Sequence, residues 1–248
     1  MQPFFFDPDH LAKLAAAHAP AYRDARPFPH VVIDDFLPDA VAQQLVDEFP
    51  GPGEVPWIAY DSDTERKLES LDETRLGDFT RHAIAQFNAG SMLTFLHELS
   101  GIEGLVPDPL LWGGGLHQIE RGGFLEVHAD FNLHPATQLH RRLNLLLYLN
   151  PGWQDDWGGH LELWDADMRA CCARIAPSFN RLVVFNTDRT CFHGHPHPLT
   201  CPDGVTRKSL ALYYYAREPG PGGTSDPRFE NTLFQKRPAP SRWRRRRH

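Results

Sequence analysis

The sequence predicts a mainly β fold, a sandwich or a barrel, with a layer of helices before it. From about residue 110, short apolar runs are separated by glycine, proline, asparagine and aspartate, a pattern typical of many short strands joined by turns. Residues 1–105 instead space their apolar residues as helices do. We therefore expect a mostly helical region over 1–105, a β core over 106–218, and a tail rich in proline, glycine and arginine over 219–248.

Three helices are expected in the first region. One begins behind Pro38, carries apolar residues at helical spacing and stops at Pro50. The second covers Phe79–Phe87, and the third follows at 91–101, where it ends at a glycine. Between the first two helices, residues 51–70 are polar and proline-rich, so we expect a long loop there.

Six strands are expected in the core, at 115–120, 124–130, 142–149, 160–164, 181–185 and 208–216. Within residues 143–149, leucine occupies every odd position, and the even positions hold Asn144, Leu146 and Tyr148. Successive side chains of a strand point to opposite faces. We therefore expect the odd-numbered leucines to pack on helices, while Asn144 and Tyr148 line a polar cavity.

The composition is that of an ordinary globular protein of 248 residues, 41% hydrophobic and 23% charged. It contains no apolar run of the length that spans a bilayer, and its first residues lack the basic and apolar segments of a signal peptide. The four cysteines show no CxxC spacing, so reduced thiols are expected. We therefore expect a cytoplasmic protein without a membrane partner.

The net charge of −7 is unevenly distributed. Five of the 25 basic residues are arginines in the last seven positions, so the rest of the chain holds 20 basic residues against 32 acidic ones. This acidic body argues against a nucleic-acid-binding surface, and the arginine-rich end is interpreted as a solvated tail. The expected partner is a small molecule, or a peptide or protein substrate. The sequence does not define an oligomeric state.

A candidate metal site begins with His128 and Asp130, which close an apolar strand after two glycines. In a strand, residues two apart project from the same face and can converge on one ion. The triplet His-x-Asp occurs about once by chance on this composition, so its position at the end of a strand carries the argument. A similar pair, His160 and Glu162, is interpreted as the solvent-facing rim of an edge strand.

The third ligand is expected from a distant strand. His193, His195 and His197 share one parity, so alternation along a strand does not choose among them. His193 is the first of them after the apolar run 182–185, whereas the other two precede prolines, which favour a loop. We expect His193, with His195 as the alternative. Two histidines and a carboxylate can occupy one face of an octahedral ferrous ion and leave positions open for a chelating co-substrate and oxygen.

A cation for such a co-substrate is present on the last expected strand. Arg207 and Ser209 share one face of it. A guanidinium group holds a carboxylate through two parallel hydrogen bonds, and a serine hydroxyl can add a third. Tyr148 and Asn144, on the polar face of the leucine-rich strand, complete the expected pocket.

Several motifs in order resemble the prolyl 4-hydroxylase-like branch of the iron(II)- and 2-oxoglutarate-dependent oxygenases. They are His128-x-Asp130, the strand Arg142–Asn150, Trp157-Gly-Gly-x-Leu-x-Leu, Asn180-Arg-Leu-Val-Val-Phe, Phe192-His193-Gly and Arg207-x-Ser209. With an opening segment that begins at Pro27, the resemblance covers most of residues 27–217. It implies a double-stranded β-helix, a distorted jelly roll, with helices outside the larger sheet.

The resemblance also implies roles for the candidate residues. The implied iron ligands are His128, Asp130 and His193. The implied co-substrate contacts are Arg207 with Ser209 at the distal carboxylate of 2-oxoglutarate, and Tyr148. The segment between the last histidine ligand and Arg207 is longer than in compact members of the family, which keeps His195 open as a ligand.

The expected activity is that of a dioxygenase that uses Fe(II), 2-oxoglutarate and O2 and releases succinate and CO2. It would hydroxylate a protein side chain, an amino acid or a small metabolite. One alternative is a cupin-like metal dioxygenase or isomerase without 2-oxoglutarate, which gives no reason for Arg207 and Ser209. The other is a catalytically silent jelly-roll binding module, which predicts no stoichiometric metal.

Overall fold

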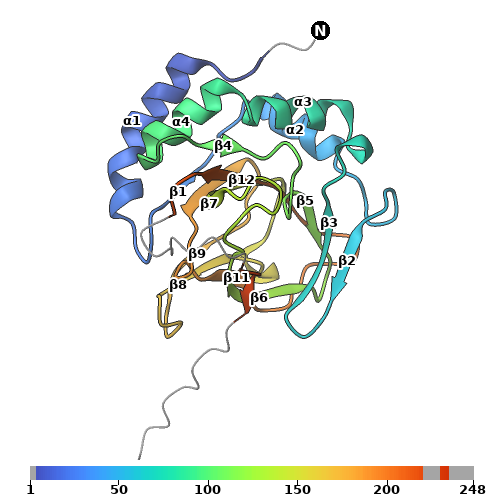
Figure 1. Cartoon of the computed structure of the whole chain (residues 1–248). Coiled ribbons are helices and arrows are strands. Elements are labelled where there is room, and N and C mark those ends of the chain that lie inside the picture. The colour runs from blue at the N-terminus through green and yellow to red at the C-terminus, as the bar shows by residue number, and fades with distance from the viewer. Residues whose placement is uncertain (1–3, 220–229, 235–248) are drawn as a thin grey trace, which may run out of the picture.

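The computed structural model describes residues 4–219 and 230–234. In these residues, four α-helices cover one side of a strongly curved assembly of 13 strands, all paired antiparallel (Figure 1). The prediction of a jelly-roll core with an N-terminal helical layer is confirmed. None of the described helices combines the length and the apolar character that crossing a bilayer requires.

The three helices expected from the sequence are present as α2 (Asp39–Asp47), α3 (Asp78–Phe87) and α4 (Gly90–Ser100). The third ends at Gly101, whose φ of 75° is a left-handed conformation that glycine adopts without a Cβ clash. A further helix, α1 (Pro8–Asp24), packs against α4. Its first turn is capped by the Asp7 carboxylate, which accepts a hydrogen bond from the backbone N–H of His10, the third residue of the helix.

The larger sheet lies under the helices. In spatial order its strands are β1 (His30–Ile33), β10 (Arg181–Asn186), β7 (His140–Tyr148), β12 (Arg207–Ala216) and β5 (Gly115–Ile119). The odd-numbered leucines of β7, with Leu149 after it, are buried in the same apolar cluster as the inner faces of the helices. The opposite face of β7 presents Asn144 and Leu146 to a pocket. The predicted division of the two faces is therefore confirmed at these positions.

The smaller sheet closes the other side of that pocket. Its strands are β6 (Phe124–Ala129), β11 (His193–His195), β8 (Leu161–Trp164) and β9 (Cys171–Ile175). All six strands expected from the sequence are present, with ends displaced by no more than two residues. The sequence analysis did not separate out β1, β9, β11 or the two-residue strand β4 (Val106–Pro107), which pairs with β12.

The prediction of a long loop over residues 51–70 is wrong. Its second half forms a hairpin of β2 (Ile58–Asp61) and β3 (Glu65–Ser70), and β3 bridges the two sheets by pairing with both β5 and β6. The side chains that β3 turns into the pocket are charged, so this strand lacks the apolar alternation that identifies strands in a sequence. The region 1–105 therefore also contributes strands to the core. The boundaries at residues 105 and 218 stay predictions.

Part of the tail expected over 219–248 pairs with the core, so interpreting residues 219–241 as an exposed tail is wrong for the residues that the structure describes. Residues 233–234 form β13, which pairs with β6 so that Phe234 lies opposite His128. Before it, the Glu230 backbone N–H donates a 2.7 Å hydrogen bond to Asn132 Oδ1. The remainder of that tail, including the five terminal arginines, lies outside the described residues.

Candidate metal and co-substrate site

A pocket of about 510 Å³ lies between the two sheets. Strands of both sheets and the β2–β3 hairpin supply side chains to its wall, so segments distant in sequence meet there. Every candidate site residue except Tyr148 lines this pocket. Tyr148 is fully buried directly behind it.

The structure brings His128, Asp130 and His193 together at one end of the pocket. Their nearest ligand atoms all lie within 4.8 Å of one another. The pairing of β6 with β11 explains this arrangement, because His193 is the partner of His128 across the ladder and Asp130 follows two residues after His128. All three side chains are at most 9% exposed.

Each histidine in this group is oriented by a backbone carbonyl. His128 Nδ1 lies 2.9 Å from the Glu126 carbonyl oxygen, and His193 Nδ1 lies 3.1 Å from the Cys191 carbonyl oxygen. A carbonyl only accepts, so Nδ1 of each ring carries the proton and donates it. The Nε2 lone pairs are therefore left for an ion, and these Nε2 atoms lie 3.6 Å and 3.5 Å from the Asp130 carboxylate oxygens.

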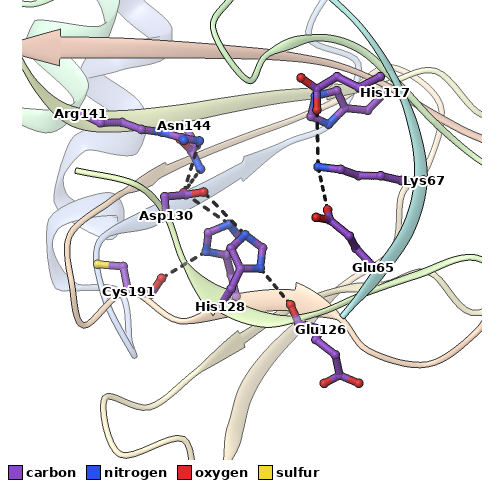
Figure 2. A network of polar contacts seen from close by, with 11 residues as sticks. Glu65, Lys67, His117, Glu126, His128, Asp130, Arg141, Asn144 and Cys191 are labelled. Atoms are coloured by element: carbon purple, nitrogen blue, oxygen red, sulfur yellow. Dashed lines mark hydrogen bonds and ion pairs between the residues drawn. The ribbon is translucent and has the colours of Figure 1, made fainter. Parts of the chain in front are cut away.

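The Asp130 carboxylate is held from behind by two polar side chains (Figure 2). Asn144 Nδ2 donates a 2.8 Å hydrogen bond to Asp130 Oδ2, and Arg141 Nη2 lies 3.3 Å from the same oxygen. Arg141 also donates to Asn144 Oδ1 at 2.9 Å. Burial alone would raise the pKa of Asp130, but the positive charge of Arg141 and the neighbouring imidazoles hold that pKa well below its ordinary value.

The donor set fits a ferrous ion. Burial lowers the pKa of His193 to about 4, against the opposing effect of Asp130, so this ring is neutral at physiological pH. A neutral imidazole pair and an ionised carboxylate are the forms that ligate a metal. Two nitrogens and one carboxylate, gathered at one side of an open pocket, match the ligand set of non-haem iron(II) oxygenases.

The structure separates the alternatives left open by the sequence. His195 also lines the pocket but is not part of the group of converging ligand atoms, and His197 is exposed. The rival pair is buried and so is not a solvent-facing rim. His160 Nε2 lies 2.7 Å from Asp155, and Glu162 accepts from the Trp164 indole. Neither belongs to a candidate metal group among the described residues.

Arg207 lies at another part of the same pocket. The side chain is 5% exposed and is fixed by two bonds, with Nε donating to the Gly159 carbonyl at 2.7 Å and Nη2 donating to the Tyr148 hydroxyl at 3.1 Å. Gly159 leaves no room for a Cβ, which would approach the arginine side chain to 2.9 Å. The remaining N–H groups of the guanidinium are available to a ligand, and Ser209 lines the pocket on the same face of β12.

Two of the predicted co-substrate contacts have protein partners here. Asn144 bonds to Asp130 and Arg141, and Tyr148 bonds to Arg207. Both therefore hold a neighbouring functional side chain in place. Their direct contact with a co-substrate stays a prediction.

Sequence reasoning missed a charged network on β3 and β5 (Figure 2). Lys67 Nζ lies 3.2 Å from Glu65 and 3.5 Å from Glu69, and His117 Nε2 lies 3.8 Å from Glu69. Burial raises the pKa of Glu69 and lowers that of His117 to about 3. Charged residues at every second position, 65, 67 and 69, could have indicated a strand with one polar face.

Two further missed residues come from the C-terminal segment. Thr232 and Phe234 line the pocket, and the Phe234 ring lies 5.4 Å from the His128 ring, centroid to centroid. Neither local motif nor periodicity predicts this, because a two-residue strand carries too little pattern to be recognised.

Comparison with known proteins gives a family match for the β core. Residues 114–215 match the 2OG-Fe(II) oxygenase superfamily, and this match spans every candidate ligand and the co-substrate arginine. The match covers 102 of the 248 residues, so over this part the chain resembles the superfamily. The match, together with the converging His-Asp-His group, indicates Fe(II) and 2-oxoglutarate as cofactors and O2 as co-substrate.

Individual relatives share part of the sequence or the fold. The chain is 32% identical to mouse prolyl 3-hydroxylase OGFOD1 over 93 residues, which are 36% of this chain and 16% of that protein. Among solved structures, a prolyl 4-hydroxylase of Pseudomonas putida superposes with a TM-score of 0.57 at 17% identity, covering 84% of this chain and all of the other. A Trichoplax adhaerens prolyl hydroxylase bound to a peptide of hypoxia inducible factor gives the same TM-score and identity, with coverage of 84% and 91%. These structures show the fold that the chain shares.

Proposed function

We propose that the protein is an iron(II)- and 2-oxoglutarate-dependent dioxygenase that hydroxylates an organic substrate. The observation that carries the proposal is one pocket with two elements: the converging group of His128, Asp130 and His193, and a buried, partly unsatisfied Arg207. A metal centre and a carboxylate-binding cation are the two requirements of a chelating 2-oxo acid with a distal carboxylate.

In this proposal, His128 and His193 hold the ion through Nε2, and Asp130 holds it through a carboxylate oxygen. The backbone carbonyls of Glu126 and Cys191 fix the two rings. Arg141 and Asn144 keep the carboxylate ionised and oriented. Such outer partners raise the basicity of ligands and keep them in place before the ion binds. When bound, the iron and 2-oxoglutarate supply the oxidative chemistry, with succinate and CO2 as products.

Arg207 is proposed to hold the distal carboxylate of 2-oxoglutarate. Its Nε donates a hydrogen bond to the Gly159 carbonyl, and Nη2 donates one to the Tyr148 hydroxyl. These two bonds fix the orientation of the planar guanidinium and leave its other N–H groups for a ligand. A fixed fork loses little freedom when it binds a carboxylate through two hydrogen bonds. Ser209 supplies a third donor from the same strand face.

We further propose a prolyl residue of a peptide or protein as the first substrate class to test. The mouse relative of 32% identity is a prolyl 3-hydroxylase by name, although the chain spans only 16% of its length. The pocket rim offers the partly exposed apolar side chains Ile58 and Trp112. A reducing, cytoplasmic location is part of the proposal and is consistent with four free cysteines.

The test is turnover of 2-oxoglutarate by the Fe(II)-loaded protein, followed as succinate by mass spectrometry. Proline-containing peptides, free amino acids and small metabolites are offered in turn, and the true substrate gains one oxygen atom. Succinate that depends on both iron and 2-oxoglutarate supports the proposal. Metal-dependent turnover without 2-oxoglutarate would instead support the cupin-like alternative, and absence of stoichiometric metal would support a binding module. The superfamily match favours neither alternative.

A further inference from the structure

His195 is a buried histidine without a hydrogen-bond partner. It is 4% exposed, and neither Nδ1 nor Nε2 has a partner among the described residues. Buried polar groups are nearly always hydrogen-bonded, and leaving one unsatisfied destabilises a protein. A polar side chain that persists in this state is expected to find its partner in a ligand.

The backbone around His195 places its side chain on the pocket side of β11. β11 pairs with β6 through His193 and His195, with an irregularity between the two pairs. Gly194 separates them, and a Cβ there would approach the carbonyl oxygens of Leu125 and Glu126 to 2.8 Å. This close contact holds β11 against β6. Both histidines line the same pocket.

The surroundings of His195 identify the chemistry of the missing partner. The side chain lies outside the converging metal group and lines the same pocket as Arg207 and Ser209. His117, whose Nε2 also lacks a hydrogen-bond partner, lies 3.8 Å from Glu69 and so belongs to the charged network of β3. His195 has no such neighbour at ion-pair distance among the described residues. Beside Arg207, the fitting partner is an anion with several lone pairs.

We propose that His195 donates a hydrogen bond to the distal carboxylate of 2-oxoglutarate, beside Arg207 and Ser209. A neutral imidazole presents one N–H donor, and a carboxylate accepts about four hydrogen bonds, more than the free edge of Arg207 alone supplies. This inference rests on the proposed function. It adds to it a binding residue on the strand that carries His193, so that one short strand serves both the metal and the far end of the co-substrate.

The test compares two 2-oxo acids in the Mn(II)-loaded full-length protein. 2-Oxoglutarate has the distal carboxylate, whereas 2-oxobutanoate has the same chelating group without it. Replacing His195 with leucine is expected to weaken 2-oxoglutarate binding about tenfold or more and to leave 2-oxobutanoate binding unchanged. His195→Gln, which keeps an N–H donor, should retain most of the affinity. His197→Leu, at the exposed neighbour, is the control and should change neither.

A second readout separates this role from a structural one. In the metal-free protein without ligand, His195→Leu should melt at the same or a higher temperature, because an unsatisfied buried polar group has been removed. Equal losses for both 2-oxo acids, unchanged 2-oxoglutarate binding, or a large fall in melting temperature would each overturn the inference. A wild-type protein that binds neither 2-oxo acid would instead overturn the proposed function itself.

Discussion

The two ends of the pocket differ in how their polar groups are satisfied. At the end formed by His128, Asp130 and His193, each ring donates to a carbonyl and the carboxylate has two polar partners. At the end formed by Arg207 and His195, a guanidinium edge and a whole imidazole have no partner among the described residues. We infer that the first end is preset before metal arrives, and that the second is completed by a ligand.

The largest expected effect is at the preset end. His128→Ala removes a proposed ligand and should lower metal-dependent turnover more than about 100-fold, beyond the loss typical for an outer partner of a metal site. The measurements are metal content and succinate formation. His197→Ala, at an exposed position, is the matched control. Full metal content in the His128 variant would remove it from the ligand set.

At the end formed by Arg207 and His195, Arg207→Ala should weaken 2-oxoglutarate binding roughly 100-fold, because two charge-assisted hydrogen bonds are lost. Arg207→Lys keeps the charge but not the planar fork, so an intermediate loss is expected. Isothermal titration of the metal-loaded variants measures both. Metal affinity should stay unchanged; a loss of metal binding together with 2-oxoglutarate binding would mean that the two ends are not separable.

A substitution at Asn144 tests whether this residue supports the metal ligands or contacts 2-oxoglutarate. The sequence suggested a co-substrate contact, but in the structure Asn144 bonds to Asp130. Asn144→Ala should therefore weaken metal affinity about 10- to 100-fold and leave 2-oxoglutarate affinity at saturating metal unchanged. A selective loss of 2-oxoglutarate affinity would restore the original assignment.

Acid should destabilise the metal-free protein through the pocket histidines. The folded pKa values of His117 and His193 are about 3 and about 4, below the ordinary 6.5. At a pH between the folded pKa values and 6.5, the unfolded chain binds protons that the folded chain does not. The free energy of unfolding therefore falls as pH drops below about 6.5. Each histidine contributes up to about 1.4 kcal/mol per pH unit.

Glu69 acts in the opposite sense, because burial raises its pKa, but it is one group against three, since burial also lowers the pKa of His195. Thermal melts from about pH 7 to about pH 5 check the sign. His117→Gln should flatten the profile. A melting temperature that rises toward acid would contradict the neutral state of these rings.

The smallest effect is expected at the C-terminal strand. Phe234 covers the His128 ring and is half-buried, whereas its neighbour Leu233 is 47% exposed. Phe234→Ala should lower stability by about 1–2 kcal/mol, a few degrees of melting temperature. Leu233→Ala should change it little. Equal effects of the two variants would mean that β13 does not pack on the metal end.

The sequence predicted those parts of the site that lie on strands with a clear hydrophobic pattern. His128, Asp130 and Arg207 follow or begin long apolar runs, and the leucine alternation of β7 correctly divided its two faces. Their roles as ligands and as a carboxylate anchor stay predictions, but their convergence in one pocket was foreseen. The superfamily match over the β core and the jelly-roll fold were also foreseen, because an ordered series of motifs is more specific than any one triplet.

What the sequence did not reveal depends on tertiary pairing. β3 is polar on its pocket side, so it has no hydrophobic alternation, and its ladders with β5 and β6 supply the stability that its side chains do not. β13 is too short to carry a pattern. The choice between His193 and His195 required the register of β11 on β6, since the two residues share one parity. The sequence analysis did not single out Arg141, because its contact with Asp130 depends on how distant strands pack.

The most direct test of the central claim is an anaerobic titration of metal-free protein with Fe(II) and 2-oxoglutarate, followed by visible absorption. A 2-oxo acid that chelates ferrous iron produces a metal-to-ligand charge-transfer band. We expect this band in the wild type, its loss in the double variant His128→Ala, His193→Ala, and its displacement to higher 2-oxoglutarate concentration in Arg207→Ala. A folded wild-type protein that shows no band with both in excess would contradict the account.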